Sequence, residues 1–307
     1  MSTLEMLFGH VTMASAFRVA CPMIVAAMGG VFSHSAGVFN FAYECIMLCG
    51  AFFAAYGSHI SGSYVVGGLF AAGVGMLLAA VFGFFVYKLK ANAALVSSAL
   101  NMSAWALTTL LLYTIFGVRG RVVSDTIINY PKIHFDFLDR FPTLSYILND
   151  NIWMVYFAYI LVIAAFVVMY HTSFGLRCRG VGINPAAAET VGVNVGRMRW
   201  TTLLIMGLFS GLAGSYMPMS GLSTFNENMT SGVGYLVWAA ILVGKSNPVL
   251  TAITCFVFAY TDALSTVLTA LEVPMQLVSM IPYATVIVTL FVVGLRSFTG
   301  KPRILGD

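Results

Sequence analysis

Charged residues are scarce in this sequence, and their scarcity excludes several classes of protein. Only 8% of the 307 residues are Asp, Glu, Lys or Arg, whereas a typical soluble domain carries about 25%. So few charges could not cover the surface of a soluble globule, which excludes a soluble enzyme, a disordered protein and a nucleic-acid-binding protein. Because 60% of the residues are hydrophobic, the class that remains is a membrane protein with several spans.

Cysteine is also rare, and its pattern supports neither a disulfide framework nor a metal site. The five cysteines are odd in number and show no CxxC spacing, so we expect small buried hydrophobic side chains. They are Cys21, Cys45, Cys49, Cys178 and Cys255. The histidines are scattered, which gives a metal cluster no support. The first basic residue, Arg18, already lies in an apolar stretch, so we expect no cleavable signal peptide.

Long apolar runs are abundant, and about 20 apolar residues suffice for a helix to cross the roughly 30 Å of hydrocarbon. The runs lie near 12–32, 38–57, 64–87, 93–117, 152–170, 200–220, 232–244, 248–270 and 278–295. They predict an all-α bundle of nine membrane-entering helices that forms one transmembrane domain over residues 1–307. The run 38–57 contains polar residues, and the run 232–244 is short. We expect both to be irregular or broken helices, which occur where they line a cavity or are buried in protein.

The basic residues predict how the bundle is oriented. Ten of the 15 fall on one side if the nine runs alternate across the membrane. They are Lys88, Lys90, Arg177, Arg179, Arg197, Arg199, Lys245, Arg296, Lys301 and Arg303. The positive-inside rule makes that side cytoplasmic. The segment 118–151, in which four acids balance four basic residues, is then outside. The N-terminus, with a short surface helix near residues 2–10, is also expected outside, and the C-terminus inside.

One stretch between two spans, 171–199, carries helix signals of its own. Asn184 is a good N-cap, and Pro185 suits the first helical position. Three alanines favour a helix, and Gly192 can follow its end with positive φ. These signals predict a helix over 185–191, about 10 Å long. It is either an ordinary capped loop helix or a small-faced element that docks on another protein. The candidate docking residues are Asn184, Pro185, Ala187, Ala188, Glu189 and Gly192.

This stretch resembles the coupling-helix region of permease subunits of ABC importers, in the family of ribose, nucleoside and branched-chain amino acid permeases. The matching residues are Gly175, Leu176, Arg177, Arg179, Gly182, Asn184, Ala187, Ala188 and Gly192. Three further stretches agree in order, at 36–44, 210–215 and 234–248. The first is similar to the Gly-x-x-Asn-x-x-x-Glu-Gly segment of the nucleoside-type branch, although Cys45 stands where the last Gly is usual.

The resemblance implies a division of labour between subunits. Two permeases, often two different chains, form the pathway, and an extracytoplasmic binding protein delivers the substrate. Two cytoplasmic ATPase subunits bind ATP and Mg and receive the coupling helices. The sequence lacks the G-x-x-x-x-G-K-[ST] motif, so we expect a non-catalytic chain without a cofactor of its own. The nucleoside-type branch fits best, while riboflavin, ribose and branched-chain amino acids remain open as substrates.

Polar residues inside the spans are the candidate pathway residues, because an ionisable group there should face protein or water. Asn40, Tyr43 and Glu44 have the spacing of one helix face. Together they could hydrogen-bond a sugar hydroxyl or stack on a base. The alternative is that Glu44 caps a broken helix or pairs with a neighbouring span.

Two polar stripes supply the remaining candidates. One runs from Ser97 to Thr108 and includes Asn101 and Trp105, and the other begins at Asp262. We expect Asn101, Trp105 and Asp262 along the pathway, with hydrogen bonding between helices as the alternative. A secondary transporter would need charge pairs or an ion site at mid-membrane, and a membrane-embedded enzyme would need clustered catalytic groups. The sequence favours neither.

Overall fold

The computed structural model describes residues 9–136, 146, 149–221, 223–270, 278 and 280–299, and this part of the chain is mostly helical. The helices are α2 (His10–Ser35), α3 (Tyr43–Ser61), α4 (Tyr64–Gly83), the π-helix η1 (Phe84–Lys88), α5 (Ala93–Phe116), α7 (Trp153–His171), α8 (Ser173–Ile183), α9 (Pro185–Thr190), α10 (Val195–Met219), α11 (Val233–Val243), α12 (Pro248–Ala270) and α14 (Met280–Thr299). All five cysteines are buried and free, as predicted. The surface helix expected near residues 2–10 lies mostly outside the described residues. Lys301 and Arg303 lie entirely outside them.

Six helices in the described part of the chain are long and apolar enough to cross a membrane. They are α2, α4 with η1, α5, α7, α10 and α12, while α11 and α14 give shorter apolar stretches. The buried helix α3 is not among the six. The structure therefore supports a multi-pass helical bundle, and the number of nine membrane-entering helices stays a prediction.

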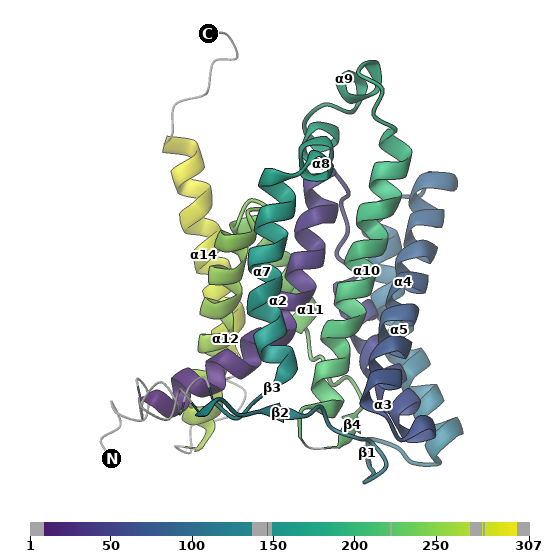
Figure 1. Cartoon of the computed structure of the whole chain (residues 1–307), viewed down its shortest axis with the longest axis vertical. Coiled ribbons are helices and arrows are strands. Elements are labelled where there is room, and N and C mark those ends of the chain that lie inside the picture. Colours follow the sequence, from purple (N-terminus) through teal and green to yellow (C-terminus); the bar gives the residue numbers. More distant parts are fainter. Residues whose placement is uncertain are drawn as a thin grey trace.

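The long helices run side by side, with α9 at one end of the molecule and the strands at the other (Figure 1). The helices α2 and α10 are the most buried of the six candidate spans, and α10 packs against α2, α3 and α4. Small residues permit this packing. A methyl group on Gly75 of α4 would overlap the carbonyl oxygen of Gly207 of α10. Close backbone approach of this kind is how helices associate in lipid.

Two short antiparallel strand pairs lie at the end opposite α9 (Figure 1). The strand β1 (Arg121–Val123) pairs with β4 (Thr224–Asn226), and β2 (Lys132–Ile133) pairs with β3 (Asn151–Ile152). The prediction of a purely helical chain was wrong in this detail. Strands of two or three residues are too short to show the alternating pattern by which a strand is recognised in a sequence.

Of the two runs predicted to be irregular or broken helices, 232–244 gives the short helix α11, whereas 38–57 gives a continuous helix, α3, that follows a non-helical segment. Residues 36–42 are not helical, so α3 begins only at Tyr43. The helix α11 has 11 residues, which corresponds to about 16 Å, or roughly half of the hydrocarbon thickness. Because Asn40 precedes α3, the prediction that Asn40, Tyr43 and Glu44 share one helix face was wrong. The side chain of Asn40 accepts a hydrogen bond from the Ala42 N–H at 2.7 Å, a local bond that competes with helix formation.

Candidate functional site

The start of α3 and the start of α11 meet through the side chain of Glu44. Its Oε1 accepts hydrogen bonds from the Thr230 hydroxyl and from the Gly232 N–H, the latter at 2.9 Å. Its Oε2 accepts the Gly234 N–H at 2.8 Å. The first N–H groups of a helix lack partners within it and carry partial positive charge. The carboxylate of α3 therefore caps α11, and this bonding offsets the cost of holding Glu44 at 6% exposure.

The contact between the two helix starts is close enough to require glycine. A methyl group on Gly234 would overlap the backbone of Tyr43 and Glu44. This geometry matches the alternative in which Glu44 caps a broken helix. The sequence reasoning missed its partners at 230–234, and the signal that could have found them was Gly232 and Gly234 at the beginning of an unusually short apolar run.

Asn101 of α5 holds the same junction from another side. Its Oδ1 accepts the Cys45 N–H at 3.0 Å, near the start of α3. Its Nδ2 donates to the Phe41 carbonyl oxygen and to the Tyr235 hydroxyl, each at 3.2 Å. Asn101 thus links α5 to both α3 and α11, as expected of an amide that joins helices in lipid.

Asn40 lies beside this junction and is also buried. Its Oδ1 accepts the Ser97 hydroxyl of α5 at 3.2 Å in addition to the Ala42 N–H. Its Nδ2 has no hydrogen-bond partner among the described residues. The structure therefore brings Asn40, Glu44 and Asn101 together in one polar junction.

The side chains of Tyr43 and Trp105, by contrast, make none of the described hydrogen bonds of this junction. Tyr43 is fully buried, and a methyl group on Gly30 of α2 would overlap its hydroxyl, so its ring packs against α2. Trp105 is 56% exposed on α5. A spacing of i, i+4 and i+8 drifts around a helix of 3.6 residues per turn, which explains why Trp105 lies on a different face from Ser97.

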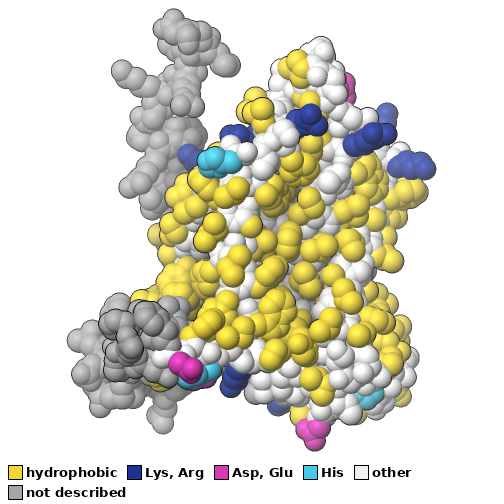
Figure 2. All heavy atoms as spheres, viewed as in Figure 1, with side chains coloured by type: hydrophobic (Ala, Val, Ile, Leu, Met, Phe, Trp, Pro, Cys, Tyr) yellow, Lys and Arg dark blue, Asp and Glu magenta, His cyan; other side chains and the backbone are white. Residues whose placement is uncertain are grey.

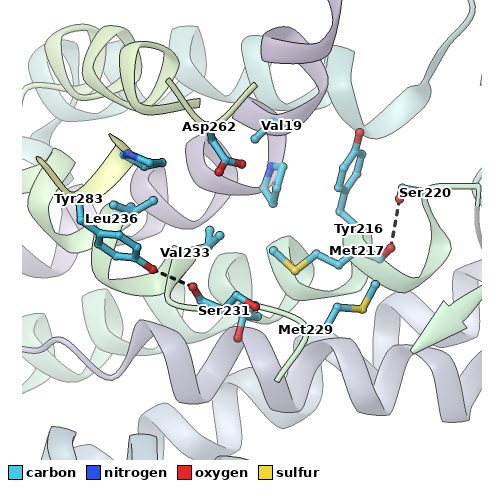
Figure 3. Close-up of a pocket in the computed structure, with 13 residues that line it drawn as sticks. Val19, Tyr216, Met217, Ser220, Met229, Ser231, Val233, Leu236, Asp262 and Tyr283 are labelled. Carbon is cyan, nitrogen blue, oxygen red and sulfur yellow. Dashed lines mark hydrogen bonds between the residues drawn. The ribbon is translucent and has the colours of Figure 1, made fainter. Parts of the chain in front are cut away.

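A cavity of about 450 Å³ opens beside the start of α11 (Figure 3). Small-molecule sites commonly measure about 300–1,000 Å³. The walls come from α2, α10, α11, α12, α14 and the segment 229–231. The lining residues are Val19, Pro22, Tyr216, Met217, Ser220, Met229, Thr230, Ser231, Val233, Leu236, Asp262, Pro282 and Tyr283. Because Thr230 also bonds to Glu44, the polar junction fixes one wall of this cavity.

Asp262 of α12 is the one charged residue in the lining. Its carboxyl group points into the cavity in Figure 3 and has no hydrogen-bond or ion-pair partner in the part of the chain that the structure describes. Across the cavity, the Tyr283 hydroxyl donates to the Ser231 carbonyl oxygen at 2.9 Å. Asp262 is thus separate from the junction around Glu44, although both border the segment that leads into α11.

The stretch 171–199 contains two helices where one was predicted. The helix α9 (Pro185–Thr190) agrees with the prediction of 185–191. The Asn184 side chain caps it by accepting the Ala187 N–H at 3.2 Å, and Gly192 follows its end with a φ of 82°. The sequence reasoning missed α8 (Ser173–Ile183), which the Thr172 side chain caps. Both helices lie at one end of the bundle (Figure 1).

The outer face of α8 and α9 is apolar, and three of the predicted docking residues, Asn184, Ala187 and Ala188, line a groove on it. Ala188 is only 7% exposed and packs against Val181 and Val195, so most of its side chain faces inward. Ala187 is exposed, and a groove of about 400 Å³ beside it is lined largely by apolar side chains. Ile183, on its rim, is 85% exposed. Leu176 and Val191 are likewise exposed members of the groove, and none of these three was chosen from the sequence as a docking residue.

Comparison with known proteins places this bundle in a family. Residues 12–290 match the family described as the branched-chain amino acid transport system / permease component. The chain is 30% identical to the nucleoside ABC transporter permease protein NupC of Lactococcus lactis, over 92% of this chain and 91% of that protein. It is 31% identical to the guanosine ABC transporter permease protein NupQ of Bacillus subtilis, over 88% of each.

A solved structure supports the fold independently. A chain of an inward-facing ABC transporter assigned to the metal-chelate type superposes with a TM-score of 0.51 at 15% identity, covering 92% of this chain and 85% of that one. The helical bundle is thus that of an ABC transporter permease. The chain belongs to the family of permease components of the branched-chain amino acid transport system, and it is a multi-pass membrane protein.

Proposed function

We propose that this chain is the membrane subunit of an ATP-driven importer that carries a nucleoside-like solute across a bacterial inner membrane. The observation that carries the proposal is the similarity, along nearly the whole chain, to permeases named for nucleosides and guanosine. The polar junction adds support, because Asn40 and Glu44 of the nucleoside-type segment lie beside the start of α3, where Glu44 also caps the short helix α11. Short or broken helices of this kind border substrate sites in many transporters.

The chain forms half of the pathway, and a second, different permease subunit forms the other half. A cytoplasmic ATP-binding subunit binds ATP and Mg and drives transport, and an extracytoplasmic lipoprotein delivers the solute. The exposed apolar groove beside Ala187 is the surface that receives the ATP-binding subunit. ATP hydrolysis belongs to the ATP-binding subunit, since this sequence has no phosphate-binding loop of its own.

The α9 end of the bundle faces the cytoplasm. Lys and Arg side chains gather near that end in Figure 2, in keeping with the positive-inside rule. Nine helices enter the membrane in this proposal, α3, α11 and α14 in addition to the six long ones. The segment 118–151 and the N-terminus are then outside, and the C-terminus is in the cytoplasm.

Riboflavin, ribose and branched-chain amino acids are the alternative solutes, because selectivity resides largely in the binding protein. An ion-coupled secondary transporter is less favoured. Glu44 already accepts three hydrogen bonds from the segment that starts α11, which leaves about one of its four lone-pair sites for a coupling cation.

Reconstitution with its partners tests the function. The chain is co-expressed with the ATPase, second permease and lipoprotein of the same gene neighbourhood, purified and placed in proteoliposomes. Uptake of radiolabelled guanosine, ribose, riboflavin and leucine is then measured with and without ATP. We expect guanosine uptake that requires both ATP and the lipoprotein. Uptake driven by an ion gradient without ATP would overturn the proposal.

A further inference from the structure

We propose that the cavity beside α11 binds an uncharged solute through hydrogen bonds to the Asp262 carboxylate, and that it disfavours the phosphorylated form of the same solute. This inference rests on the proposed importer function and deepens it. It assigns a binding site within this chain, and it names the chemical class that the site accepts, a nucleoside rather than a nucleotide.

The first argument is the distribution of polar groups. A volume of about 450 Å³ accommodates a small molecule, and most of the wall is apolar. In its ionised form, the carboxylate of Asp262 is an acceptor only, with two oxygens that can each receive hydrogen bonds. A vicinal diol or neighbouring N–H groups would match it, while Met217, Met229 and the ring of Tyr283 would contact the flat part of such a solute.

The second argument concerns charge. No Lys, Arg or His belongs to the cavity lining in the described part of the chain. The N-terminus of α11 would ordinarily be the place for an anion, but the Glu44 carboxylate already accepts its N–H groups. A phosphate would therefore meet one carboxylate in the cavity and a second behind its wall. The cation near this wall, Arg18, is not among the lining residues and already donates to the Asn151 side chain at 2.9 Å, so it compensates little of this repulsion in a medium of low dielectric constant.

Charge-selective labelling tests the site without requiring transport. Ser231 is exposed at the cavity wall, whereas all five native cysteines are buried. In the complete complex, a Ser231→Cys variant is treated with a cationic and with an anionic methanethiosulfonate reagent. The ratio of the cationic to the anionic labelling rate should be about tenfold higher for this cysteine than for a free thiol in solution. This is a typical size for electrostatic steering into a cleft. Adding Asp262→Asn should remove most of this preference.

A matched control is available one turn along α12. Thr266 is exposed and donates only to the backbone carbonyl of Asp262, so Thr266→Val should leave the labelling preference unchanged. If the preference is the same with and without Asp262→Asn, the carboxylate does not set the charge selectivity and the inference is wrong.

Protection and uptake complete the test. Guanosine should slow the labelling of Ser231→Cys, and guanosine 5′-monophosphate should not. Equal protection by both would overturn the inference.

Asp262→Asn should lower guanosine uptake by about tenfold, the effect of losing hydrogen bonds to a charged group, while ATPase copurification stays at the parental level. If the parental complex imports no guanosine, the proposed solute fails. If the complex imports guanosine and Asp262→Asn does so equally well, the inference alone fails.

Discussion

Glu44 and Gly234 join the starts of two helices that lie far apart in the sequence. The Glu44 Oε2 accepts the Gly234 N–H at 2.8 Å, and the missing side chain of Gly234 allows the two backbones to meet. A carboxylate that serves as the cap of another helix satisfies a buried charge and a buried helix end at the same time. The junction is therefore a structural requirement as well as a border of the cavity.

Replacing the charge in this junction should weaken both the fold and transport. Glu44→Gln places an amide NH₂ group where the carboxylate accepts N–H groups of α11. We expect the free energy of unfolding to fall by about 2 kcal/mol, the value of hydrogen bonds to a charged group, and uptake to fall with it. Thermal unfolding in detergent and uptake in proteoliposomes measure the two effects. Asn40→Ala, which removes the acceptor of the Ala42 N–H, should also lower transport.

Glu227→Gln is the control for that change. Glu227 also accepts a backbone N–H, that of Gly120 at 2.8 Å, but it does so in an exposed position. Its loss should cost no more than about 0.5 kcal/mol. If Glu44→Gln unfolds at the same temperature as the parental protein and transports at the parental rate, the carboxylate does not hold α11.

Substitutions of two neighbouring alanines at the groove beside Ala187 should have different effects. Ala187→Trp adds bulk on the exposed face, so the chain should fold normally but copurify with less ATPase. Ala188→Trp enlarges a side chain packed between Val181 and Val195, and overpacking costs about 1–3 kcal/mol. This variant should unfold at a lower temperature. Parental stability in Ala188→Trp would contradict the packing described.

Ile183→Ser separates docking from folding more cleanly. The Ile183 side chain is almost fully exposed, so its removal should change stability within about 0.5 kcal/mol. ATPase copurification and solute-stimulated hydrolysis should nevertheless fall, because the exposed apolar anchor is lost. Glu189→Lys on the same helix should have the milder effect. If Ile183→Ser copurifies and transports at the parental level, the groove is not the docking surface.

The orientation can be tested with single cysteines. Ala187→Cys and Asp136→Cys both place a thiol at an exposed position, at opposite ends in this proposal. An impermeant maleimide added to intact cells should label Asp136→Cys only. Native Cys178 should stay silent even in opened membranes, because burial raises the pKa of its thiol to about 12 and keeps it protonated at neutral pH. Labelling of Ala187→Cys in intact cells would reverse the topology.

The packing of α4 on α10 offers a pair of matched glycines. Gly75→Ala would overlap the carbonyl oxygen of Gly207 and should destabilise the protein by about 1–3 kcal/mol. Gly73→Ala, on the same helix, meets nothing within 4 Å and should be neutral or stabilising by up to about 1 kcal/mol, since Ala is the better helix former. Thermal unfolding of both variants in detergent is the measurement, and a similar shift in both would disprove the close contact.

The sequence predicted local features well where a single residue determines them. Asn184 and Pro185 start α9 because capping depends on neighbours along the chain. The short helix α11 was also predictable, since a run as short as 232–244 cannot span the membrane. Three glycines make α8 an unpromising helix in the sequence, and two of them have a packing explanation. A methyl group on Gly182 would overlap the backbone of Ser35, and one on Gly175 would overlap the backbone of Met169.

The site was harder to predict because its partners are distant in the chain. Nothing near Glu44 in the sequence indicates that residues 230–234 donate to it. The inward position of Ala188 depends on Val181 and Val195, on the neighbouring helices. Trp105 shared a polar spacing with Asn101, but the spacing could not tell which face of α5 is covered.

The short ladder between β1 and β4 connects the end of the molecule opposite α9 to the wall of the cavity. Arg121 pairs with Asn226, only three residues before the cavity-lining Met229. Glu227 adds a second tie, because its N–H donates to the Gly120 carbonyl oxygen at 2.9 Å. Residues 119–123 are thus connected to the wall of the cavity through a few backbone hydrogen bonds. A force applied at these residues would therefore change the shape of the cavity at the same time.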